Sequence, residues 1–138
     1  MTATITTETK TDSTYASGAV DRIVAPYGAK VPLSFKSISY QGYTPTSHAA
    51  ITWKLIIKST RDASDTVDTA AIIDVTNASL TLGTAPFAVG YALDTTATGF
   101  AERALYYGEL WADDSTYGLN PVAEFQLRLG PAVRAVFT

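Results

Sequence analysis

Ile51-Thr52-Trp53-Lys54-Leu55-Ile56-Ile57-Lys58 is the stretch that decides the fold class. Apolar residues stand at every second position from Ile51 to Ile57, and Thr or Lys fills most positions between them. A period of two residues places alternate side chains on opposite faces of a β-strand, so this stretch predicts a strand with one buried face. Residues 30–38 and 122–129 alternate in the same way. We therefore expect a fold built from strands.

Other short segments outside this stretch are rich in β-branched and aromatic residues and are separated by turn-forming residues. They predict strands at 22–25, 70–75, 79–83, 87–93, 103–112 and 133–137. The spacing of an amphipathic helix does not persist beyond one or two turns anywhere in the chain. Seven to nine short strands of this kind predict an all-β fold, an immunoglobulin-like antiparallel β-sandwich, over residues 21–138.

Residues 1–20 differ in composition from the rest of the chain. Seven threonines occur by position 14, and Ile5 is the single Ile, Leu or Val before Tyr15. Such a segment has high β-propensity, but it buries too little apolar surface to offset the entropy lost on ordering. We expect an extended N-terminal arm that docks on a neighbouring subunit, with Thr4, Ile5, Thr6 and Tyr15 as contact residues.

Bulk composition excludes several classes of protein. The chain has 138 residues, 17% of them charged, with a net charge of -3 and no cysteine. This length suits one domain, and the absence of a basic footprint argues against binding nucleic acid. Disulfides and thiolate metal sites are excluded. No apolar run approaches the roughly 20 residues of a membrane span, and the N-terminus lacks the pattern of a secretory signal.

Side chains that could carry chemistry are few. His48 is the single histidine, and a packing or surface role suits it better than a catalytic or metal-binding one. Asp62, Asp65 and Asp68 recur at every third position, a spacing that fits a solvated loop better than a calcium loop. No nucleophile or phosphate-binding motif is present. We therefore expect neither a metal nor a cofactor.

Glu109 is a carboxylate within a strongly apolar segment. It could form a catalytic pair with Glu102 or Glu124, as two carboxylates do in glycoside hydrolases. A salt bridge to Arg128 or Lys54 across the sheet is the simpler interpretation, and we prefer it.

Aromatic residues make up 11% of the chain. Trp53 and Trp111 occupy the two strongest strand segments, and both are predicted to lie in the core. Tyr40 and Tyr43 fall in the loop that follows residues 30–38, and this position predicts interface anchors.

The order of four segments resembles a known family. Residues 28–35, 50–58, 71–73 and 105–114 read GAKVPLSF, AITWKLIIK, AII and LYYGELWADD. Together they resemble the immunoglobulin-like modules of tailed-bacteriophage virions, such as the N-terminal domain of baseplate upper proteins. The resemblance covers residues 22–137.

This resemblance implies a self-associating component of the virion, with no catalytic residues to transfer. The first hypothesis is a non-enzymatic virion structural protein, either a capsid decoration (cement) protein or a small head or tail accessory protein. It would bind copies of itself, as a homo-oligomer with a trimer among the options, and other virion proteins. The alternative is a carbohydrate-binding β-sandwich module that uses exposed tyrosines. A small enzyme built around Glu109 is the third hypothesis.

Overall fold

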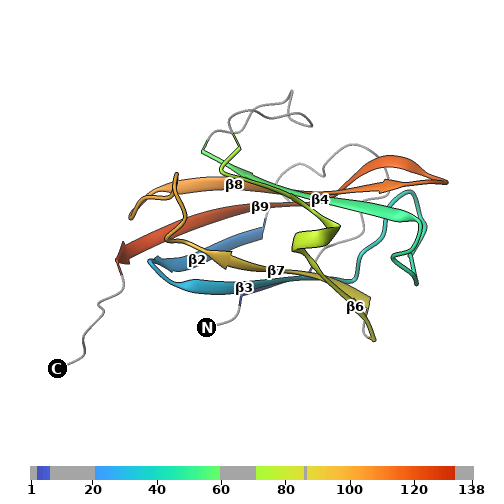
Figure 1. Cartoon of the computed structure of the whole chain (residues 1–138), viewed down its shortest axis with the longest axis horizontal. Coiled ribbons are helices and arrows are strands. Elements are labelled where there is room, and N and C mark those ends of the chain that lie inside the picture. Colours follow the sequence, from blue (N-terminus) through green and yellow to red (C-terminus); the bar gives the residue numbers. More distant parts are fainter. Residues whose placement is uncertain (1–2, 7–20, 60–70, 86, 133–138) are drawn as a thin grey trace.

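Nine strands and one short 3₁₀ turn make up the regular structure of the residues described in the computed structural model, which are 3–6, 21–59, 71–85 and 87–132. The elements, shown in Figure 1, are β1 (Ala3–Thr6), β2 (Asp21–Tyr27), β3 (Lys30–Lys36), β4 (Ile51–Lys58), β5 (Ile73–Thr76), η1 (Asn77–Ser79), β6 (Thr81–Thr84), β7 (Phe87–Asp94), β8 (Leu105–Asp114) and β9 (Gly118–Ala132).

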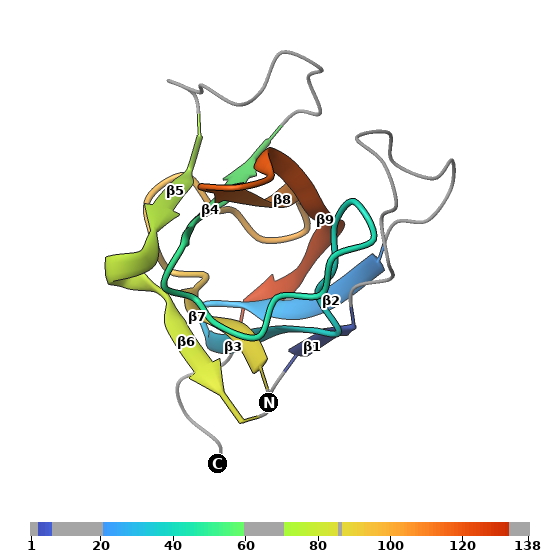
Figure 2. The ribbon, with the colours of Figure 1, turned by 90° about the vertical axis from the view of Figure 1, so that its right-hand side faces the viewer.

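The strands form two sheets, with the orders β1-β3-β7-β6 and β2-β9-β8-β4-β5. Figure 2 shows β8 and β4 facing β7 and β3 across the interior. The predicted all-β sandwich is therefore confirmed, whereas the strand expected at 133–137 lies outside the described residues. Two pairings, β1–β3 and β2–β9, are parallel rather than antiparallel. Both involve the first strands of the chain. Alternation along a strand does not indicate which sheet edge the strand joins, so these parallel pairings could not be predicted.

The core lies between the two sheets. Ile51, Trp53, Leu55 and Ile57 all point inward from β4 and are almost wholly buried. Burial of this apolar face supplies the main driving force for the sandwich. Phe35 of β3 and Phe125 of β9 meet across the core with ring centroids 5.7 Å apart. The sheets thus hold each other in place through large side chains.

Strand β8 carries apolar residues on both of its faces. Tyr106, Leu110 and Ala112 point into the core, whereas Trp111 points to the outer face of the five-stranded sheet and is half-buried. The prediction that Trp53 lies in the core is confirmed, but the same prediction for Trp111 was wrong. The sequence of a strand that is apolar on both faces does not reveal which face is inward. The pairing of Trp111 with Lys54, which lies on the outer face of β4, places Trp111 on the outer face.

Strand β1 lies on the chain's own sheet. Ala3 to Thr6 pair in parallel register with Leu33 to Lys36 of β3. This differs from the expectation that the arm docks only on a neighbouring subunit. The exposed edge of β3 offers backbone donors and acceptors, and a four-residue strand with three β-branched residues satisfies them. The remainder of the arm, including Tyr15, lies outside the described residues.

Candidate functional site

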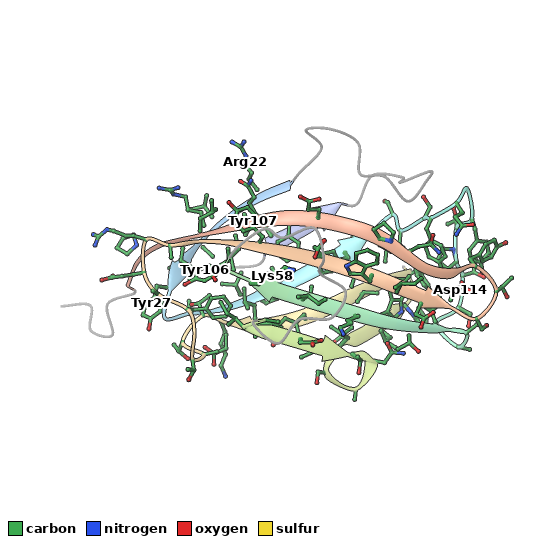
Figure 3. All side chains as sticks on the ribbon, turned by 90° about the horizontal axis from the view of Figure 1, so that it is seen from above. Arg22, Tyr27, Lys58, Tyr106, Tyr107 and Asp114 are labelled. Atoms are coloured by element: carbon green, nitrogen blue, oxygen red, sulfur yellow. The ribbon has the colours of Figure 1, made fainter. Side chains whose placement is uncertain are left out.

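Tyr40 lies buried at one end of the sandwich, in the loop after β3. Its hydroxyl donates a 2.6 Å hydrogen bond to Asp114, which lies at the right-hand end of the molecule in Figure 3. Asp114 also accepts hydrogen bonds from the backbone N–H groups of Thr116 and Tyr117, at 2.8 and 3.2 Å. The bond from Tyr40 lowers the pKa of Asp114 below its ordinary value. Burial, reinforced by Asp114, raises the pKa of Tyr40.

The prediction of Tyr40 as an interface anchor was therefore wrong. Only 1% of its surface is exposed, and its hydroxyl ties the loop to the end of β8. Loops are usually solvated, so position in a loop suggested exposure. The buried acceptor on Asp114, 74 residues further along the chain, reverses this expectation.

Tyr43 reaches the surface beside Tyr40. Its ring stacks on that of Tyr117 at 4.5 Å, and both contact the edge or face of Tyr40. Gln41 donates to the carbonyl of Tyr117 at 3.0 Å and to the side-chain oxygen of Asn120 at 2.7 Å. Tyr43 is half-buried and Tyr117 is exposed. Tyr43 thus remains a candidate contact residue, now as half of a stacked pair.

His48 packs between the sheets and is not part of a catalytic group of described residues. Trp53 Nε1 donates to His48 Nδ1 at 3.0 Å, and His48 Nε2 lies 2.8 Å from the carbonyl oxygen of Gly83. These partners require a proton on Nε2 and none on Nδ1. The ring also stacks on Phe87 with centroids 4.0 Å apart. The predicted packing role is confirmed, and it links β4 to β6.

A cluster of charged residues lies on the outer face of the five-stranded sheet. Lys58 Nζ is 3.8 Å from Glu109 Oε1, and both side chains are largely buried. Figure 3 shows Lys58 midway between the ends of the sandwich. The predicted salt bridge of Glu109 is present, and Lys58, which was not among the predicted partners Arg128 and Lys54, is a partner. Residue Lys54 pairs with Asp74 at 3.5 Å.

Register explains this choice of partner. Glu109 lies opposite Ile56 of β4, so Lys58 is its diagonal neighbour on the same face. Glu124 of β9 lies directly opposite Glu109 on the other side. The structure thus brings together one of the two carboxylate pairs considered from the sequence, whereas Glu102 lies in the connection before β8. The ammonium of Lys58 offsets negative charge at this pair.

A groove of about 270 Å³ opens further along the same outer face. It is lined by side chains from β4, β5, β8 and β9, namely Thr52, Lys54, Ile56, Thr76, Trp111, Asp113 and Leu119. This groove could not be predicted from the sequence, because its residues come from four strands. The available signal was the polar face of β4, on which Thr52 and Lys54 oppose the core. Locating Trp111 over that face required the register of β8.

Neither a metal-binding cluster nor a membrane-spanning helix occurs among the described residues. Within residues 3–6, 21–59, 71–85 and 87–132, no three His, Cys, Asp or Glu residues are grouped so that they could hold a metal ion. Asp62, Asp65 and Asp68 fall outside those ranges. Across the same ranges, no helix has the length and hydropathy needed to cross a membrane.

Together, the fold and the groove define a two-sheet β-sandwich with a tryptophan-lined groove on the outer face of its larger sheet. No family model matches the chain, and no curated protein matches it. Among solved structures, the chain is similar to the N-terminal domain of phage TP901-1 ORF48, with a TM-score of 0.49 and 10% sequence identity. The similarity covers 94% of this chain and 99% of that one.

Proposed function

We propose that this chain is a non-enzymatic structural protein of a bacteriophage virion that acts through protein–protein contacts. Within the virion it would serve as a capsid decoration protein or as a small head or tail accessory protein. The assignment to a virion rests on the resemblance of residues 28–35, 50–58, 71–73 and 105–114 to modules of tailed-phage virions. The mode of action rests on the geometry of the N-terminal strand.

The proposal depends on the position of strand β1 at the edge of its sheet. It stands at the end of the order β1-β3-β7-β6, so β3 is its one neighbour among the described strands. An edge strand presents a row of backbone N–H and C=O groups to which another chain can add. A segment of four residues held at one edge can also exchange between identical subunits. Either arrangement would join copies of this chain through main-chain hydrogen bonds.

The rest of the sandwich supports a mechanical role. Two loop residues tie distant strands together at the ends of the sheets, Tyr40 through Asp114 and His48 through Gly83. Satisfied buried hydrogen bonds of this kind hold loops in one conformation. A body with fixed loops presents its edges at constant positions, and many identical weak contacts then add together in an assembly.

The proposal is tested by removing β1 and by blocking its hydrogen bonds. A variant that lacks residues 2–18, and the variant Ile5→Pro, should keep the circular dichroism of a β-protein. Both should lose self-association in sedimentation and light-scattering measurements, because proline removes a backbone donor and disfavours an interior strand position. Ile5→Val preserves the backbone and is the matched control, which should assemble like the wild type.

Immunogold labelling of purified phage particles tests whether the protein is part of the virion and where it lies. Label on heads would indicate a decoration protein, and label on tails a tail accessory protein. Unlabelled particles would refute the virion assignment. Normal self-association of the truncated chain would refute the role given to β1.

A further inference from the structure

The groove on the outer face has an aromatic floor. Trp111 of β8 lines it, opposite Lys54 of β4 and Pro121 of β9. Ile56, which is fully buried, closes the base, and Leu119 forms an exposed wall. Trp111 Nε1 is shielded from water and has no hydrogen-bond partner among the described residues. The indole is thus available to a ligand through its ring and not through its N–H group.

The rim of the groove is polar and carries both signs of charge. Thr52 and Thr76 contribute hydroxyls, Asp113 a carboxylate and Lys54 an ammonium. Asp74 lies 3.5 Å from Lys54 but does not line the groove. The lining itself carries one negative charge, on Asp113, and one positive charge, on Lys54. This balance of charge complements a neutral ligand that has several hydrogen-bonding groups.

We propose that the groove binds a neutral saccharide, with one sugar ring stacked on the indole of Trp111. A pyranose presents a flat face of C–H bonds and a girdle of hydroxyls, and this pattern matches an apolar floor within a polar rim. Asp113 accepts hydrogen bonds from two sugar hydroxyls, and the threonine hydroxyls donate to or accept from others. The volume falls just below the range of small-molecule pockets, which suits a sugar unit or two.

This site is independent of the proposed assembly through β1. The groove uses β4, β5, β8 and β9 of the five-stranded sheet, whereas β1 belongs to the other sheet. The groove is lined by seven residues, whereas each partner in a stable protein interface contributes roughly 20–30. A sugar is therefore the occupant that the groove fits best.

The test uses the full chain and four neutral sugars, D-glucose, D-galactose, N-acetyl-D-glucosamine and L-rhamnose. Saturation-transfer NMR at millimolar sugar should detect binding of at least one. Trp111→Ala and Asp113→Ala should each weaken that binding by about tenfold or more, since each removes a stacking or charge-assisted contact. Val24→Ala is the matched control, because Val24 is 63% exposed on β2 and does not line the groove.

Circular dichroism tests whether each variant is folded. If Trp111→Ala is unfolded, Asp113→Ala alone decides whether the groove binds the sugar. Absence of saturation transfer from all four sugars would overturn the proposal. So would binding that the folded groove variants leave unchanged. If the groove variants abolish self-association while no sugar binds the wild type, the groove is a protein interface and the saccharide proposal fails. The saccharide proposal does not depend on the assembly of Ile5→Pro, because that variant changes β1 and not the groove.

Discussion

Replacing Gly108 by Ala should destabilise the sandwich through a steric conflict with Phe125. A Cβ atom at position 108 would lie 2.1 Å from Cζ of Phe125 and 2.4 Å from each Cε, whereas ordinary contacts are 3.4–4 Å. The ring must therefore retreat by about 1 Å. Phe125 is fully buried and meets Phe35 across the core, so this movement disturbs the opposite sheet.

The size of the effect follows from two opposing contributions. Overpacking a core costs about 1–3 kcal/mol, and replacing glycine by alanine within a strand returns about 0.5–1 kcal/mol. We expect a net loss of about 1–2 kcal/mol in the free energy of unfolding. Urea denaturation followed by circular dichroism measures it, as a lower midpoint with an unchanged slope.

Gly90→Ala is the matched control, because Gly90 also lies within a strand. A Cβ atom there would meet nothing closer than 3.4 Å, so this variant should be as stable as the wild type or slightly more stable. Phe125→Leu in the Gly108→Ala background should recover part of the loss, because the smaller side chain leaves room for the methyl group. If Gly108→Ala proves as stable as Gly90→Ala, the packing of Phe125 over Gly108 is wrong.

Four further predictions concern the ends of the sandwich and its two tryptophans. Tyr40→Phe should cost about 1.5–3 kcal/mol in urea denaturation, because Asp114 loses a buried donor. Folding lowers the pKa of Asp114, so this residue contributes to the free energy of unfolding above its unfolded pKa of about 3.9. The contribution is lost as the pH falls through the folded pKa. Asp114→Asn should therefore flatten the dependence of stability on pH in that acid range. Trp53→Ala should cost about 3–5 kcal/mol and Trp111→Ala much less, and acrylamide should quench Trp111 more strongly than Trp53; equal quenching would contradict their placement. Nitrogen-15 NMR should find His48 as the Nε2–H tautomer, and an Nδ1–H resonance would show that the bond from Trp53 is absent.

Several features of the fold could be predicted from local patterns. The alternation in residues 51–58 identified β4, including which of its faces is buried, and residues 30–36 gave β3 in the same way. The polar environment of a loop and a single histidine were enough to give His48 a packing role. Such inferences succeed because alternation with a period of two is a property of neighbouring residues, and one apolar face must be buried.

Features that depend on distant partners could not be predicted. Trp111 and Tyr40 were placed on the wrong sides of the surface, because β8 is apolar on both faces and the acceptor of Tyr40 is 74 residues away. The parallel position of β1 has no local signal, and the polar face of β4 does not by itself place Trp111 over the groove.

The sequence alone therefore specified an all-β chain with a Thr-rich beginning, since composition and alternation are local. Strand order, register and the contents of each face emerged in the folded molecule, where residues far apart in the chain meet. A shift of one residue in the pairing of β8 with β4 would turn Trp111 into the core and remove the groove. The candidate saccharide site is thus a product of register, which long-range packing of Phe125, Trp53 and their neighbours determines.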